Sequence, residues 1–96
     1  MKKMLFIVNP RSGREQIRGK LLDVLDLFSG SGFCIQLYVT QGQKDATKAV
    51  KRFGQEMDLV VCSGGDGTLN EVISGLMALD APPCLGYIPA GSTNDY

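Results

Sequence analysis

The sequence predicts an α/β fold with three layers, in which a mostly parallel β-sheet carries helices on both faces. Short apolar runs alternate with amphipathic helical patterns in the order β-α-β-α-β-α-β, and the connections between them are short. Such alternation is typical of parallel strands joined by right-handed crossovers. The 96 residues, with 44% hydrophobic and 21% charged side chains, have the composition of one small globular domain. The pattern leaves the strand order open.

Two strands are predicted in the first half of the chain, with a helix between them. Residues 4–8 are continuously apolar, which is typical of a strand buried on both faces. Apolar residues then recur at helical spacing from about 14 to 28, until the Ser-Gly repeat at 29–32 ends the helix. Residues 34–39 alternate between apolar and other side chains, as expected of a second strand.

The second half of the chain continues the alternation. A helix is predicted from about 44 to 53, a strand at 58–62, a helix at 68–79 and a strand at 84–88. Pro82 and Pro83 separate the last helix from the last strand. We therefore expect four strands and three helices in one domain.

Composition and charge exclude several classes of protein. The chain has no histidine for a Ser-His or Cys-His pair, and no segment approaches the ~20 apolar residues of a membrane span. No helix interleaves basic and aromatic residues, so no nucleic acid partner is expected. Six Lys and Arg residues against one Glu give residues 1–20 a net charge of +5, which residues 21–96 balance at −5. This basic end is either a phosphate-attracting surface or a solvated face.

The cysteines indicate a reducing compartment. Cys34, Cys62 and Cys84 match neither the spacing of metal ligands nor that of a disulfide framework. Each lies at the start or end of an apolar run, so we expect buried thiols. The expected location is the cytoplasm.

Polar, glycine-containing loops follow the first, third and fourth predicted strands, at residues 9–13, 63–68 and 89–95. The carboxyl ends of parallel strands meet at one edge of a sheet, where ligands bind. Each loop also has capping-box spacing, namely Ser12 with Glu15, Thr68 with Glu71, and Ser92 with Asp95. We therefore expect three helix starts to direct their free N–H groups toward one edge, where they form an anion site.

The loop after the third strand is the richest in glycine. Gly64, Gly65 and Gly67 allow a phosphate chain to lie against the main chain. Asp66 would then contact a divalent cation that bridges it to the phosphates, or a hydroxyl of the ligand. The alternative is a tight turn between strand and helix, with Asp66 as a carboxylate near the helix start. The Walker A pattern and the G-x-G-x-x-G fingerprint are both absent.

Three motifs together resemble a known family. The segments NPRSG at 9–13, GGDGTLNEV at 64–72 and PAGSTND at 89–95 resemble the catalytic domain of diacylglycerol kinases, and most closely the bacterial soluble lipid kinases related to sphingosine kinases. GGDGT alone is shared with NAD kinases and, more loosely, with phosphofructokinases. The segments at 9–13 and 91–95 favour the lipid-kinase branch. The resemblance implies the Rossmann-like N-terminal domain of the diacylglycerol kinase and NAD kinase type.

The resemblance also implies binding of ATP with Mg2+ and phosphorylation of a lipid hydroxyl, in diacylglycerol or a related lipid. The ATP-binding residues that it implies are Asn9, Pro10, Arg11, Ser12, Gly13, Thr40, Gly64, Gly65, Asp66, Gly67, Thr68, Leu69, Asn70, Glu71, Thr93 and Asn94. Asp66 is the implied metal contact, directly or through water. Thr68 is expected to cap its helix and to donate to phosphate. Arg11 either meets phosphate or is a solvated loop residue, and Asn70 and Glu71 either bind ATP or only cap.

The family also has a second, β-rich domain, which carries the lipid site and an acidic residue thought to act as general base. The sequence ends at Tyr96 just after a helix start, so we expect residues 1–96 to be the N-terminal ATP-binding part of a longer lipid kinase. We expect no catalytic residue in this chain and no turnover by it alone. The implied partners are ATP, a lipid bound mainly by the missing domain, and a membrane contacted peripherally by the full-length protein.

Two alternatives and one further expectation complete these predictions. GGDGT is also compatible with an NAD kinase-like phosphotransferase, and a chain without a general base is also compatible with a non-catalytic nucleotide-binding or structural module. A surface that normally meets a second domain predicts self-association into homo-oligomers.

Overall fold

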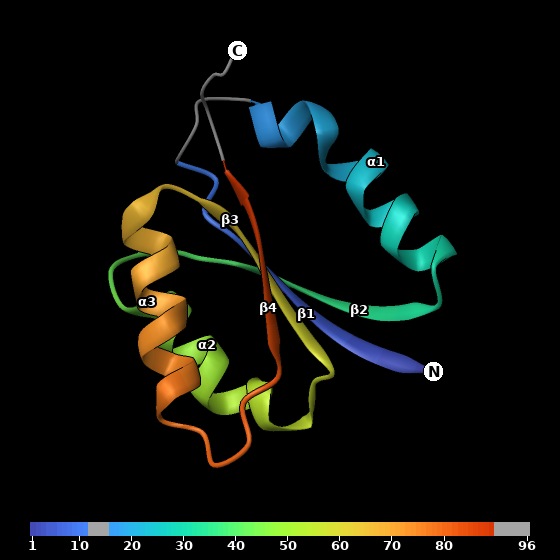
Figure 1. The fold of residues 1–96 in the computed structure, drawn as a ribbon. Helices are drawn as coiled ribbons and strands as arrows, with labels where there is room; N and C mark the ends of the chain where they lie inside the picture. The colour runs from blue at the N-terminus through green and yellow to red at the C-terminus, as the bar shows by residue number, and fades with distance from the viewer. Residues whose placement is uncertain (12–15, 90–96) are drawn as a thin grey trace.

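The computed structural model describes residues 1–11 and 16–89, and its strands form one parallel sheet with helices on both faces (Figure 1). Along the chain, the elements are β1 (Lys2–Val8), α1 (Gln16–Gly30), β2 (Phe33–Val39), α2 (Asp45–Phe53), the 3-10 turn η1 (Gly54–Glu56), β3 (Leu59–Gly64), α3 (Asp66–Met77) and β4 (Cys84–Pro89). Neighbouring strands pair in parallel in the order β2-β1-β3-β4. The predicted fold class is confirmed.

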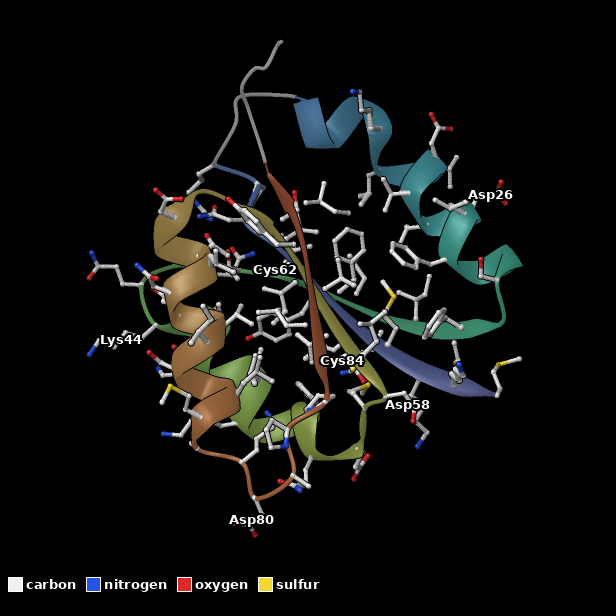
Figure 2. All side chains as sticks on the ribbon, viewed as in Figure 1. Asp26, Lys44, Asp58, Cys62, Asp80 and Cys84 are labelled. Carbon is white, nitrogen blue, oxygen red and sulfur yellow. The ribbon has the colours of Figure 1, made fainter. Side chains whose placement is uncertain are left out.

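The central strand β1 explains the continuous apolar run in the sequence. Successive side chains of a strand point to opposite faces of the sheet. Met4, Phe6 and Val8 therefore pack in the cluster that includes α1, whereas Leu5 and Ile7 pack in the cluster that includes α2 and α3. All five are buried, because β1 has a strand on each side and a helical layer on each face (Figures 1 and 2).

Helices α2 and α3 pack against each other at a glycine. A Cβ atom at Gly75 of α3 would lie 2.8 Å from Cβ of Val50 and 3.0 Å from the carbonyl oxygen of Thr47, both in α2. Val50 is itself fully buried. Since real Cβ atoms do not approach other atoms so closely, the absence of a side chain at position 75 sets the spacing of these two helices.

The prediction of buried cysteines is right for Cys62 and wrong for Cys34 and Cys84. Cys62 lies in β3, one of the two inner strands, and is fully buried, whereas the other two are exposed. Both exposed cysteines lie at the beginning of edge strands, β2 and β4, which have a neighbouring strand on one side only. An apolar run marks a strand, but it does not say whether the strand is central.

Within residues 1–11 and 16–89, none of the helices has the length and apolar character that a membrane crossing requires.

Candidate functional site

The carboxyl edge of the sheet has a crevice between elements that lie far apart in the sequence. The loop after β1 leads to α1 on one face, and the loop after β3 leads to α3 on the other. Ligands of doubly wound sheets bind at such a reversal. A cleft of about 410 Å³ lies here, and its lining residues come from the loops that follow β1, β2 and β3 and from the N-terminal halves of α2 and α3. They are Asn9, Arg11, Thr40, Gly42, Gln43, Ala46, Gly65, Gly67, Thr68 and Glu71.

The start of α3 opens on this cleft without a side-chain cap among the described residues. Gly65 is the N-cap residue, in extended conformation with φ −88°, and its carbonyl oxygen accepts the first helical hydrogen bond from the N–H of Leu69. The N–H groups of a first helical turn have no partner inside the helix, and the helix dipole places positive potential there. The geometry of α3 therefore favours an anion at this edge.

Thr68 does not cap α3, and this prediction is wrong. The helix begins at Asp66, so Thr68 lies inside its first turn and not before it. The Thr68 hydroxyl instead accepts a hydrogen bond from Asn9, with 3.2 Å between Nδ2 and Oγ1. The helix starts earlier than the capping-box spacing suggests, because an extended Gly65 can act as N-cap by itself.

The glycines of this loop have two different environments. Gly64 is buried, and a Cβ atom there would lie 2.7 Å from Oγ1 and 2.9 Å from Cβ of Thr68. Gly64 is therefore a packing residue. A Cβ at Gly65 or Gly67 would meet no atom of the described residues within 4 Å, and both glycines line the cleft.

The loop after β1 is tied to the loops after β2 and β3. The N–H of Asn9 donates to the carbonyl oxygen of Ser63 at 3.1 Å, and its Oδ1 accepts from the N–H of Arg11 at 3.0 Å. Nη1 of Arg11 donates to the carbonyl oxygen of Thr40 at 2.9 Å, which occupies one of the five donors of the guanidinium. Thr40 is buried, and its hydroxyl donates to the carbonyl oxygen of Val8 at 3.3 Å. Asn9 thus joins two of the predicted loops at one point.

Glu71 belongs to α3 but caps a different helix. Its Oε2 accepts from the N–H of Lys44 at 2.9 Å, and its Oε1 accepts from the N–H of Ala46 at 3.3 Å, at the start of α2. The expectation that Glu71 forms a capping box with Thr68 in its own helix is therefore wrong. A local spacing rule does not anticipate a partner on a neighbouring helix.

Tyr87 of β4, which no sequence motif indicated, supports the glycine loop. Its hydroxyl donates to the carbonyl oxygen of Gly64 at 2.9 Å. Burial raises the pKa of the Tyr87 phenol, and the nearby charge of Asp66 raises it further. The phenol therefore stays a neutral donor, and the end of β3 is held from both neighbouring strands.

The structure brings together seven of the residues that were implied to bind ATP and places others elsewhere. Asn9, Arg11, Thr40, Gly65, Gly67, Thr68 and Glu71 line the cleft, whereas Pro10, Gly64, Asp66, Leu69 and Asn70 do not. Ser12, Gly13, Thr93 and Asn94 lie outside the described residues. In the part of the chain that the structure describes, no three acidic or cysteine side chains form a metal cluster, and a metal contact by Asp66 stays a prediction.

Gly42, Gln43 and Ala46 line the cleft but were not predicted. They follow β2, whose carboxyl end lies at the same edge as those of β1 and β3. The signal that indicates them is the topology itself, since the loop after every parallel strand reaches this edge. The lack of a glycine-rich motif in this loop hid its contribution.

Comparisons with known proteins point to one family. A family model described as diacylglycerol kinase catalytic domain matches residues 3–96. The diacylglycerol kinase of Bacillus subtilis (strain 168) is 45% identical over 97 residues, which cover 100% of this chain and 32% of the relative. The diacylglycerol kinase of Staphylococcus saprophyticus is 42% identical over 96 residues, which cover 99% of this chain and 32% of that protein.

A solved structure gives the same result in three dimensions. The crystal structure of a diacylglycerol kinase from Bacillus anthracis str. Sterne matches with a TM-score of 0.84 and 35% identity, over 94% of this chain and 33% of that one. The chain spans about a third of the length of the curated relatives that it matches. The motifs, the fold and these comparisons lead to one conclusion: the chain belongs to the diacylglycerol kinase catalytic domain family.

Proposed function

We propose that this chain forms the ATP-binding part of a lipid kinase that phosphorylates the hydroxyl of diacylglycerol or a related lipid. Family membership and relatives named diacylglycerol kinase support the reaction class. The cleft at the carboxyl edge of the sheet supports the proposed location of the ATP site. An NAD kinase shares only the GGDGT segment, and the matched family favours the lipid kinase.

The observation that carries the proposal is the presence of glycine at positions 65 and 67. Neither backbone is left-handed, because Gly32 is the only glycine with positive φ among the described residues. Within residues 1–11 and 16–89, no atom crowds either position. Inside a helix, glycine is less stable than alanine by roughly 0.5–1 kcal/mol, so Gly67 weakens α3 without a packing reason in the described part of the chain, whereas Gly65 suits its N-cap position. A ligand that approaches the backbone more closely than a side chain permits explains Gly67, and Gly65 lines the same cleft.

The chemistry of the cleft fits a triphosphate. The open first turn of α3 supplies N–H donors and the positive end of a helix dipole, and the Arg11 guanidinium adds a cation. Mg2+ commonly keeps several waters and binds through one or two carboxylates together with substrate phosphates. Asp66, exposed in the first turn of α3, fits that donor set as a single carboxylate. Phosphoryl transfer depends mainly on such positioning and on neutralisation of charge.

Binding of ATP is tested by calorimetry with and without Mg2+. We expect saturable binding to this chain and loss of most of the affinity in Gly65→Val, whose side chain would occupy the cleft. Gly19→Ala in α1 serves as the control, because position 19 is exposed and lies outside the cleft. Absence of binding at millimolar ATP, or equal affinity of Gly65→Val and Gly19→Ala, would refute the proposal.

The acceptor is tested with a hybrid enzyme. This chain replaces the matching 97 residues of the Bacillus subtilis diacylglycerol kinase, and the hybrid is assayed with diacylglycerol and with NAD as acceptors. We expect transfer of the ATP γ-phosphate to diacylglycerol and none to NAD. A folded hybrid that phosphorylates NAD, or that binds ATP without any transfer to the lipid, would contradict the assignment.

A further inference from the structure

The N-terminus of α2 is capped by a side chain from another helix. Lys44 precedes α2 and occupies the N-cap position in left-handed conformation, with φ 67° and ψ 1°, and its side chain makes no capping hydrogen bond (Figure 2). A lysine has no acceptor with which to cap. Glu71 of α3 accepts instead from the N–H of Lys44 at 2.9 Å and from the N–H of Ala46 at 3.3 Å.

This one carboxylate performs both parts of a capping box. In an ordinary box, the N-cap side chain accepts from an amide of the first turn, and the third helical residue accepts from the N-cap amide. In α2 the third residue is Thr47, whose hydroxyl donates to the carbonyl oxygen of Glu71 at 2.7 Å. Glu71 is thus joined to the start of α2 through its side chain and its main chain, and its negative charge suits the helix dipole.

The loop before α2 is fixed by a carboxylate from each side. Asp45 of α2 accepts from the N–H of Gln41 at 2.7 Å and from the hydroxyl of Tyr38 at 3.0 Å. Glu71 holds the other end of the loop at Lys44. Of the two acids, only Glu71 belongs to α3, the helix that begins at the glycine loop. Gly42 and Gln43 form one wall of the cleft. Glu71 therefore holds this wall in position relative to α3.

We propose that Glu71 is a positioning residue that fixes residues 41–44 against α3 and thereby sets the width of the cleft before ATP binds. The inference rests on the proposed function for the role of the cleft, whereas the restraint itself exists without nucleotide. A left-handed non-glycine residue is disfavoured sterically, so the loop relaxes toward negative φ at Lys44 when its hydrogen bond is removed. We expect this relaxation to displace Gly42 and Gln43, which line the cleft, relative to the glycine loop.

The restraint is tested first without nucleotide, by amide hydrogen exchange measured with NMR. In Glu71→Ala, we expect exchange at the N–H groups of Lys44 and Ala46 to accelerate at least about tenfold, while the N–H of Leu69 is unchanged. Glu71→Gln keeps one acceptor oxygen and should therefore protect one of the two amides from exchange. If Glu71→Ala does not fold, Glu71→Gln serves as the test. Unchanged exchange at both amides in both variants overturns the inference.

The link to ATP is tested by second-site rescue. We expect Glu71→Ala to lower the affinity for ATP about tenfold. Lys44→Gly, introduced into Glu71→Ala, should raise that affinity again by at least about threefold, because glycine adopts positive φ without steric cost. A residue that acts only by touching ATP gains nothing from a change at position 44, so absence of rescue relative to Lys44→Gly alone overturns the positioning role. If the wild-type chain binds no ATP, the proposed function fails, while the exchange experiment still decides whether Glu71 restrains the loop.

Discussion

Replacement of Gly67 by alanine should stabilise the fold and weaken ATP binding at the same time. Gly67 lies in the first turn of α3 and is exposed, and no atom from the described part of the chain lies within 4 Å of the position of a Cβ there. Alanine in a helix is favoured over glycine by roughly 0.5–1 kcal/mol. In a chain of this size, 1 kcal/mol corresponds to a change of about 4–8 °C in Tm, so we expect a rise of about 2–8 °C. The new methyl group occupies the space from which phosphate approaches, and we expect a loss of at least about tenfold in ATP affinity, or about 1.4 kcal/mol.

The two effects are separated by thermal unfolding without nucleotide and by calorimetric titration with ATP and Mg2+. Gly19→Ala is the matched control, since Gly19 is also an exposed helical glycine without neighbours, in α1. Gly19→Ala should raise Tm by a similar amount and leave ATP affinity unchanged. A fall in Tm for Gly67→Ala would show that the backbone itself requires glycine there. Equal ATP affinity in Gly67→Ala and Gly19→Ala would remove the main argument for a phosphate site.

Three further predictions concern packing, charge and pH. Gly75→Ala should destabilise the chain by about 1–3 kcal/mol in urea unfolding, because the new Cβ would lie 2.8 Å from Cβ of Val50, and a neutral effect would mean that α2 and α3 can separate without cost. Asn9→Asp keeps the side-chain shape but adds a negative charge beside the proposed phosphates, so ATP affinity should fall by about 1–3 kcal/mol and fall less at high salt; a salt-independent loss would contradict this cause. Burial raises the pKa of the Cys62 thiol from 9.0 to about 11, so its contribution to stability is complete below pH 9 and is lost as pH rises toward 11. The free energy of unfolding should fall by at most about 2 kcal/mol over this range, after allowance for solvent screening. Urea unfolding of the wild type at several pH values should show this fall, and the same experiment on Cys62→Ala should not.

The order of elements was predictable because each element has a local signature. The five buried residues at 4–8 form an uninterrupted apolar run, and a run of that kind is typical of a strand covered on both faces. The exposure of Cys34 and Cys84 was not predictable in the same way, since it depends on which strands lie at the edges. Strand order depends on which distant segments pair with one another, and no short segment encodes it.

The cleft was predictable in outline for a topological reason. Asn9 and Thr68 are 59 residues apart, yet their side chains are hydrogen-bonded, because parallel strands deliver their following loops to one edge. The partners of Glu71 were not predictable, since Lys44 lies 27 residues before it and carries no capping signal. Likewise, the sequence could not separate Gly64, which is required by the Thr68 side chain, from Gly65 and Gly67, which face open space.

The two helix starts at the cleft differ in the N–H groups that they leave uncapped, and that difference predicts how a nucleotide lies between them. Each first turn carries one carboxylate, Asp45 in α2 and Asp66 in α3. At the start of α2, the added carboxylate of Glu71 already accepts from two N–H groups, whereas the start of α3 has no side-chain cap in the described part of the chain and lies with Arg11 around the same cleft. A triphosphate is repelled by the first and attracted by the second. We therefore expect the phosphates at Gly65 and Gly67 and the uncharged nucleoside near Gly42 and Gln43. With this arrangement, Gly67→Ala should weaken the binding of ATP more than the binding of adenosine. Relaxation of the 41–44 loop in Glu71→Ala should weaken the binding of both. If Gly67→Ala lowers the affinity for adenosine as much as the affinity for ATP, the phosphates do not lie at Gly65 and Gly67, and the proposed orientation of the nucleotide is wrong.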